Sequence, residues 1–280
     1  MKLITWNIQW GLGLDGRCDL ARVVADATRI ADFDVLCLQE VSDNFPELKG
    51  TRGADQFAEL ARLLPDYAAV AGVALDIPDR KGRRKRFGNM ILSRYPVGQV
   101  LRWTLPWEAD RTKNMPRLLI EAVVMAPSGP LRVMTTHLEY SSDKLRKAQV
   151  EGIREAHRTA CARVASPRES GAGTYAVQPT TASAILTGDF NMRPEDPAKL
   201  RLSEPFAAGA PRLLDAWTAL NPDAPHPPSF CLFDQTYGEP HCCDFVFVSE
   251  GLVPRLRRVV YDVGTKVSDH QPVLVEIADR

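Results

Sequence analysis

The sequence predicts an α/β fold whose sheet is partly antiparallel. Short apolar runs alternate with amphipathic stretches, which is the pattern of strands interspersed with helices. Several neighbouring apolar runs have no helical stretch between them, and strands joined without a crossover helix pair antiparallel. No linker separates two self-sufficient halves, so we predict one domain over residues 1–280.

The first half of the chain is predicted to hold two helices among its strands. The first helix is expected near 18–31, where apolar residues from Leu20 to Ile30 recur at helical spacing. The second carries apolar residues from Phe57 to Leu64 and stops at Pro65. Strands are expected at 3–6, 34–38, 67–74, 87–92, 97–103, 118–125 and 131–136.

The second half begins with a long charged helix at 143–164. A segment rich in Gly, Pro, Ser and Thr follows at 166–181 and is expected to be a loop. Apolar runs then predict strands, separated by a proline-rich region that reaches Cys242 and is expected to be irregular. These strands are 184–187, 245–248, 256–261 and 272–277.

Composition excludes some classes of protein. The chain is 45% hydrophobic with a formal net charge of zero, so attraction to nucleic acid or membranes must be local. No run of about 18 apolar residues occurs, and the first residues are too few and too polar for a signal peptide. We expect a soluble, cytoplasmic monomer without a membrane span.

The six cysteines do not form a C-x-x-C pair, which argues against a zinc site or a redox dithiol. Cys242 and Cys243 lie beside His241 and Asp244, so a metal site there stays open as an alternative. No second ligand pair is spaced to complete it.

Polar residues stand where the predicted strands begin or end. Each alone is explained by a turn, a helix cap or a buried histidine. Strand ends and adjoining loops are also where scaffolds display catalytic groups, so their joint occurrence predicts one shared site. The residues are Asn7, Glu40, His137, Asp189, Asn191, Asp244, Asp269 and His270.

This set of side chains suits hydrolysis of phosphate esters. The negative charge of the substrate repels a nucleophile, so the reaction needs a cation and a base. Mg²⁺ prefers oxygen ligands and few carboxylates, which Glu40, Asn7 and Asp269 would supply. Asp189 is then available to activate the attacking water, and Asn191 can position both.

The histidines complete this hypothesis. His137 and His270 can donate hydrogen bonds to the phosphate oxygens as charge develops. Asp244 would hold His270 in its donating tautomer.

Five motifs at these residues resemble the endonuclease/exonuclease/phosphatase superfamily, in the order in which that family carries them. The resemblance runs from residue 5 to residue 270 and therefore covers nearly the whole chain. The motifs are Thr5-Trp6-Asn7, Leu38-Gln39-Glu40, Thr136-His137-Leu138-Glu139, Gly188-Asp189-Phe190-Asn191 and Ser268-Asp269-His270.

The resemblance implies a four-layered α/β sandwich, with two mixed β-sheets packed face to face and helices outside. It implies, for each of the polar residues named above, the role in phosphate-ester hydrolysis already described, with Mg²⁺ or Mn²⁺ as the cofactor. It adds Arg117 and Asn89, the latter in the segment 88–94, as weaker contacts to the substrate phosphate. Deoxyribonucleases pair the first histidine with a glutamate that has no counterpart near 87–92, so phosphate contact is the better supported role of His137.

The sequence leaves the substrate open. We favour a phosphodiesterase, with a phosphomonoesterase or a sphingomyelinase-like phospholipid hydrolase as alternatives. The basic run 80–86, six cations in seven residues, would grip DNA or RNA, or it is a solvated loop. More distant alternatives are a dinucleotide-binding protein, from the G-x-G-x-x-G match at 11–16, and a binding module without catalysis.

Overall fold

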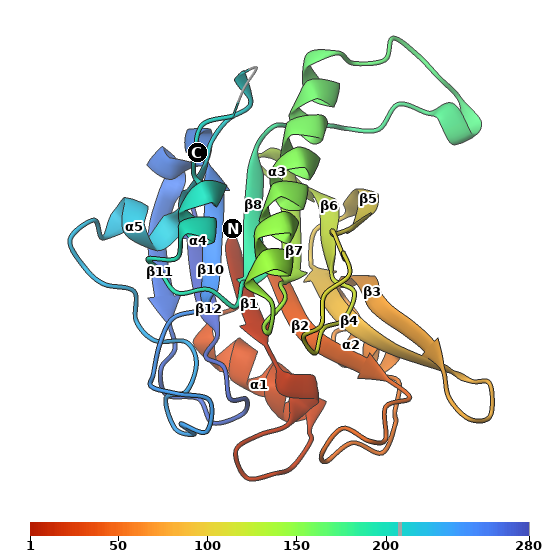
Figure 1. Cartoon of the computed structure of the whole chain (residues 1–280). Coiled ribbons are helices and arrows are strands. Elements are labelled where there is room, and N and C mark those ends of the chain that lie inside the picture. Colours follow the sequence, from red (N-terminus) through yellow and green to blue (C-terminus); the bar gives the residue numbers. More distant parts are fainter. Residues whose placement is uncertain (207–208, 280) are drawn as a thin grey trace.

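Two six-stranded sheets pack face to face, and helices lie on their outer sides (Figure 1). The computed structural model describes residues 1–206 and 209–279. This arrangement confirms the four-layered sandwich of two mixed sheets. Within the described residues, no helix is long and apolar enough to cross a membrane.

The first sheet is mixed because β1 and β2 run parallel, whereas its other neighbouring strands are antiparallel. Strand β1 lies near its centre, which places the N-terminal segment deep in the molecule. In spatial order, the strands are β11 (Leu256–Tyr261), β12 (Val273–Ile277), β1 (Lys2–Asn7), β2 (Val35–Asp43), β4 (Arg84–Ser93) and β3 (Ala68–Pro78).

The second sheet is also mixed, with β7 and β8 as its parallel pair. The short β9 closes one edge. In spatial order, the strands are β5 (Val97–Thr104), β6 (Leu118–Ala126), β7 (Gly129–His137), β8 (Ala184–Asp189), β10 (Asp244–Ser249) and β9 (Leu213–Asp215).

Alternation along the strands separates two layers of core. Successive side chains of a strand point to opposite faces, so Leu3 and Ile4 enter different layers. Leu3 packs between the sheets, in the same cluster as Ile120 and Phe247 of the second sheet. Ile4 belongs to the outer cluster, which includes Leu20 of the first helix. Nearly continuous apolar strands are therefore expected here, because both of their faces are covered.

The helices cover the outer faces. Those of the first sheet, α1 (Leu20–Ile30) and α2 (Gln56–Leu63), are capped by Asp19 and Asp55. On the second sheet, α3 (Asp143–Ala165) crosses in front of β7 and β8 (Figure 1). Ser142 caps α3 by accepting a hydrogen bond from the backbone nitrogen of Leu145.

The predicted strands and helices are all present, with four differences. Strands β3 and β4 extend further into their hairpin, ending at Pro78 and beginning at Arg84 rather than at residues 74 and 87. Strand β2 continues to Asp43 rather than ending at Leu38. The region expected to be irregular before Cys242 contains β9 and two short helices, α4 (Pro197–Leu202) and α5 (Ala216–Leu220). Elements of three to six residues show too little periodicity to be recognised. The segment 166–181 holds one turn of 3-10 helix at Gly173–Tyr175.

The basic run lies on the β3–β4 hairpin, where most of its cations have acidic partners. Four of them pair with carboxylates from the hairpin or from segments beside it. Within the described residues, Arg80 and Lys81 form no ion pair. The pairs are Arg83–Asp79, Arg84–Asp76, Lys85–Glu47 and Arg86–Asp43.

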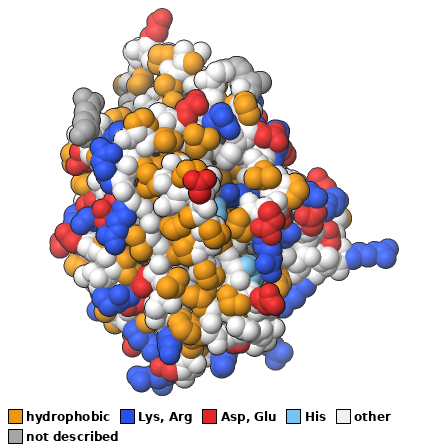
Figure 2. Space-filling view, turned by 90° about the vertical axis from the view of Figure 1, so that its left-hand side faces the viewer, with side chains coloured by type: hydrophobic (Ala, Val, Ile, Leu, Met, Phe, Trp, Pro, Cys, Tyr) orange, Lys and Arg blue, Asp and Glu red, His pale blue; other side chains and the backbone are white. Residues whose placement is uncertain are grey.

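Charges of both signs are interspersed elsewhere too. Figure 2, viewed toward the side that carries α5 and β11, shows acidic and basic side chains mixed around apolar ones.

The glycine-rich segment 11–16 does not form a dinucleotide site of the expected kind. In such a site the last glycine lies where the helix begins, so that the helix N-terminus faces the phosphates. Here α1 begins at Leu20, four residues after Gly16, and the side chain of Asp19 occupies its N-terminus. The glycines instead form a turn before the helix.

Candidate active site

The predicted site residues meet at one edge of the sandwich, where the ends of β1, β7 and β8 come together. Asp189 ends β8, and the strand register places His137 of β7 and Asp244 of β10 directly on its two sides. Gly188 must be glycine, because an added Cβ would lie 1.9 Å from the carbonyl oxygen of Thr136. The close pairing of β7 with β8 thus sets the position of Asp189.

Glu40 reaches the site through an irregularity in β2. The pairing of β2 with β4 shifts register between Leu38 and Val41, as in a β-bulge. Glu40 adopts φ of 61°, a left-handed conformation that is costly for a residue with a side chain. Such bulges redirect side chains and are common beside active sites.

Asn7 joins the two sheets at this edge. Its Nδ2 donates to Asp189 Oδ2 at 3.0 Å and to Glu40 Oε1 at 3.2 Å. Its Oδ1 accepts a hydrogen bond from the backbone nitrogen of Gln9. In this orientation Asn7 faces both carboxylates as a donor, so it would have to turn over to ligate a metal.

Glu40 and Asp269 bring negative charge to the cavity. Burial, and then the charge of Asp269, raise the pKa of Glu40 to about 7. Burial also raises the pKa of Asp269, whose Oδ2 accepts a hydrogen bond from Gln9 Nε2 at 2.7 Å. Partly buried carboxylates that repel one another are stabilised by a cation, so these residues fit a divalent metal ion.

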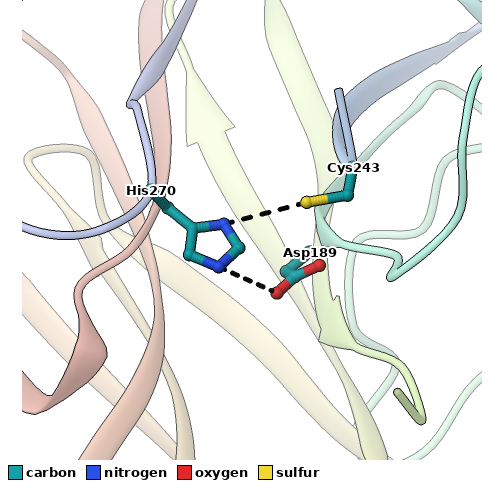
Figure 3. A group of neighbouring side chains, drawn as sticks. All are labelled: Asp189, Cys243 and His270. Carbon is teal, nitrogen blue, oxygen red and sulfur yellow. Dashed lines mark hydrogen bonds and ion pairs between the residues drawn. The ribbon is translucent and has the colours of Figure 1, made fainter. Parts of the chain in front are cut away.

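Cys243 lies beside Asp189 and His270, but it is a poor ligand for the expected metal ion. In Figure 3, one nitrogen of the His270 ring faces the Cys243 sulfur and the other faces the Asp189 carboxylate. Burial raises the pKa of the Cys243 thiol well above its usual range. Mg²⁺ and Mn²⁺ also prefer oxygen ligands to sulfur. The Cys242 thiol donates to the carbonyl of Asp244, so this pair of cysteines packs in the interior.

His270 is held on several sides. Its Nδ1 lies 2.8 Å from Asp244 Oδ2, which also accepts a hydrogen bond from Ser229 Oγ. Burial by itself lowers the pKa of His270, but the carboxylates of Asp244 and Asp189 raise it well above its usual range. The ring of Phe230 stacks on the imidazole, with centroids 4.4 Å apart. The Nε2 edge therefore faces Asp189 Oδ2, which is 3.7 Å away and beyond hydrogen-bond distance.

His137 is a neutral neighbour of the same carboxylate. Its Nε2 lies 3.5 Å from Asp189 Oδ2, and its Nδ1 lies 3.9 Å from Glu40 Oε1. Burial, and then the charge of Arg117, lower the pKa of His137 to about 3. A neutral imidazole can contact a phosphate oxygen, but it does not carry the extra proton of a general acid.

Asn191 holds the loop that follows Asp189. Its backbone nitrogen donates to Asp189 Oδ1 at 2.9 Å, which leaves Oδ2 to face the histidines. Its Nδ2 donates to the carbonyl of Leu138, next to His137. Like Glu40, it has a left-handed backbone, with φ of 51°.

The two residues predicted as weaker phosphate contacts lie in different places. Arg117 lines the cavity, and its Nε donates to Glu139 at 3.4 Å. Asn89 is buried in β4, and it is not among the described residues that line the cavity.

A cavity of about 420 Å³ opens over Asp189. Lys113 and Arg117, here called the basic wall, are among its lining residues, and Arg117 lies close enough to lower the pKa of His137. A second part of the lining, the aromatic wall, begins with Phe230 against His270. The aromatic wall consists of Trp10, Phe230 and Tyr237.

Sequence reasoning missed several contributors to this site. Ser229 and Phe230 lie in a proline-rich segment without periodicity, so no pattern marked them. Glu139 was part of a matching motif but had no role; it proves to hold Arg117 and the backbone nitrogen of Ser141. Gln9 binds Asp269, and only its nearness to Asn7 in the sequence hinted at this.

Fold and site together define a class. A two-sheet α/β sandwich carries carboxylates, amides and imidazoles at one edge, in an arrangement suited to metal-assisted hydrolysis. The chain belongs to the endonuclease/exonuclease/phosphatase family, whose model matches residues 4–270. Members of this family are hydrolases that act on phosphate esters and generally use divalent metal ions.

Among curated proteins, no sequence matches this chain. Solved structures with low sequence identity share its fold. The mannosyl-6-phosphatase Bt3783 of Bacteroides thetaiotaomicron VPI-5482 is 18% identical, with a TM-score of 0.63 and 99% of both chains covered. D. rerio TDP2 complexed with single-strand DNA product is 18% identical, with a TM-score of 0.62, covering 98% of this chain and 97% of that one. The human Nocturnin catalytic domain is 15% identical, with a TM-score of 0.61, covering 98% and 92%.

Proposed function

We propose that this protein is a Mg²⁺- or Mn²⁺-dependent phosphodiesterase in which Asp189 activates the attacking water. One observation carries the proposal: three groups converge on a single oxygen, Asp189 Oδ2. Asn7 Nδ2 donates to it, and the Nε2 atoms of His137 and His270 lie 3.5 Å and 3.7 Å away. A carboxylate oxygen between two imidazoles is well placed to accept the proton of a water that attacks phosphorus.

Glu40 and Asp269 would hold the metal ion, with Asn7 assisting. When bound, the ion would neutralise the phosphate oxygens and help the leaving group depart. The partly buried charge of these two carboxylates, described above, supports this assignment. Gln9 and Asn7 would keep the carboxylates oriented through their hydrogen bonds.

The histidines would stabilise the charge that develops on the phosphate. His270, kept protonated by Asp244, would donate from Nε2 to a non-bridging oxygen. His137 would make a neutral contact from the other side of Asp189, and Asn191 would keep the loop beside it in place. Donors that are already oriented before the reaction lower the barrier most effectively, because they need not reorganise.

The two walls favour a diester over a monoester. The reacting phosphate would lie at Asp189, with the basic wall on the His137 side and the aromatic wall on the His270 side. A diester has a substituent for each direction, whereas a monoester would leave one side unused. A phosphomonoester is the second candidate, because the similar structure of a mannosyl-6-phosphatase has this fold.

Nucleic acid remains within the proposed substrate class, since a structure with this fold, TDP2, is complexed with single-strand DNA. The pairing of the cations in 80–86 with acids favours the alternative of a solvated loop for that run. We therefore attribute substrate contact to the cavity walls rather than to the hairpin.

A substrate panel with purified protein tests this proposal. The panel comprises bis-p-nitrophenyl phosphate, p-nitrophenyl phosphate, nicked and abasic DNA, a 5′-tyrosyl oligonucleotide and sphingomyelin, each with Mg²⁺, with Mn²⁺ and with EDTA. We expect metal-dependent cleavage of diesters, faster than of the monoester. Diester cleavage that persists in EDTA, or a preference for the monoester, would contradict the proposal.

A further inference from the structure

The aromatic wall is an ordered stack that begins at the reaction centre. The Phe230 ring lies on the His270 imidazole at 4.4 Å, tilted by 26°. On Phe230, in turn, the Tyr237 ring is stacked at 6.1 Å and 23°. The side chain of Tyr237 is 62% exposed, so the stack runs from the buried imidazole to the surface.

Trp10 completes the wall from a strained segment. Gln9 and Trp10 have φ of 44° and 45°, the left-handed conformation that non-glycine residues adopt only when other contacts compensate the cost. Here the Trp10 Nε1 donates to the carbonyl of Lys49, and the Trp10 carbonyl accepts from Gln56 Nε2. The half-buried indole is therefore held at the cavity rim rather than packed into the core.

The wall is shared by two adjoining hollows. Trp10, Phe230 and Tyr237 line both the active-site cavity and a second one of about 330 Å³ that continues toward Gly13 and Lys49. A group attached to a phosphate at Asp189 can therefore lie against these rings.

We propose that the aromatic wall binds a planar aromatic ring esterified to the substrate phosphate, so that aryl or nucleoside phosphodiesters are the substrate class. This deepens the proposed function, from which it takes the position of the phosphate. Ring faces suit stacking with any planar π-system, without demanding a particular base. An acyl chain fits less well, because Gln9, Asp234 and Asp269 interrupt the apolar surface around the rings.

A binding experiment separates ring recognition from hydrolysis. Calorimetric titration of the full chain in EDTA would compare phenyl phosphate, cyclohexyl phosphate and thymidine 5′-phosphate. Stacking of one ring corresponds to about 5- to 150-fold in affinity, so phenyl phosphate should bind more tightly than cyclohexyl phosphate by a factor in this range. Thymidine 5′-phosphate shows whether a nucleobase is preferred to a simple aryl ring.

Two variants and a matched control make the test specific. Tyr237→Ala and Trp10→Leu should each remove most of the preference for the phenyl compound. Phe233→Ala should keep it, because Phe233 lies in the same loop, is 46% exposed and packs near Lys266 instead of lining either cavity. Thermal unfolding of each variant confirms that it is folded.

The outcomes differ from those that test the reaction. Equal affinity for phenyl and cyclohexyl phosphate in the wild-type protein would overturn the ring site, even if diesters are hydrolysed. A ring preference lost in Tyr237→Ala but retained in Phe233→Ala would support it, even if no hydrolysis is found. A preference lost equally in Phe233→Ala would assign the effect to the loop as a whole and would also overturn the proposal.

Discussion

Asn7 donates a hydrogen bond from Nδ2 to Asp189 Oδ2 at 3.0 Å, across 182 residues of sequence. Asn7 ends β1 of the first sheet and Asp189 ends β8 of the second. This bond therefore joins the two sheets at the edge where the proposed chemistry takes place. Because Asn7 also donates to Glu40, one side-chain amide binds both the proposed base and the proposed metal ligand.

Replacing Asp189 by Asn should remove the base while preserving the fold. We expect kcat for bis-p-nitrophenyl phosphate to fall by about 10²- to 10⁴-fold, the range typical of a positioned general base. The stabilisation by Mn²⁺ in thermal unfolding should remain. Asp196→Asn, which alters only the cap of α4, serves as the control and should keep wild-type kcat. A fall of less than tenfold in Asp189→Asn would exclude the proposed role.

Replacing Glu40 by Gln should stabilise the metal-free protein and should remove the further stabilisation that added metal gives. Burial raises the pKa of Glu40 to about 7, so at pH 8 its charge destabilises the metal-free protein. Removing that charge should stabilise this form by about 1–3 kcal/mol. Added Mg²⁺ or Mn²⁺ should raise the Tm of the wild-type protein but not that of the variant. Asp43→Asn, on the same strand, should respond to metal as the wild type does; a metal response retained in Glu40→Gln would argue against ligation.

Replacing Asp244 by Asn should lower the pKa of His270, because a carboxylate that raises it is lost. If protonated His270 is the active form, the alkaline limb of the kcat profile should move to lower pH and kcat should decrease. Ser229→Ala, which removes one hydrogen bond to Asp244 but leaves its charge, should shift the profile less. Superimposable profiles for wild type and Asp244→Asn would show that the pair does not act in the reaction.

The buried His157 should make the folded protein less stable in acid, and this effect does not involve the active site. Burial, and then the charge of Arg132, lower its pKa to about 4, compared with 6.5 for the unperturbed group. Stability is therefore complete above pH 6.5 and decreases as the pH falls toward 4, by roughly 3 kcal/mol.

The variant His157→Gln tests this directly. Glutamine can still donate toward the carbonyl of Pro211 and accept from Arg132, as the neutral ring does. The difference in unfolding free energy between wild type and variant, measured in urea from pH 7 to pH 4, should shift by this amount in favour of the variant. A constant difference would show that His157 does not titrate on unfolding.

The basic run should matter little for nucleic-acid binding. Neutralising Arg83, Arg84 and Arg86 together removes cations that already have acidic partners. We expect single-stranded DNA affinity and its salt dependence to stay within about twofold of the wild type. Weaker binding with a flatter salt dependence would instead assign DNA contact to the hairpin.

Local patterns predicted most of the fold and supplied the candidate site residues. The apolar alternation of 3–6 and the helical spacing of 18–31 depend only on neighbours in the chain, so both elements could be recognised. The helices α4 and α5 could not, because an element of five or six residues is stabilised by what it packs against rather than by its own periodicity.

The sequence by itself predicted which residues would carry chemistry, since they occur in short motifs at strand ends. Only the tertiary structure decided how they face one another. Glu40 reaches the cavity through a bulge defined by pairing with β4, and Asn7 presents its nitrogen because Gln9 binds its oxygen. The aromatic wall combines Trp10 with Phe230, residues from distant segments. Such relations depend on the register and packing of segments far apart in the chain, which no local pattern records.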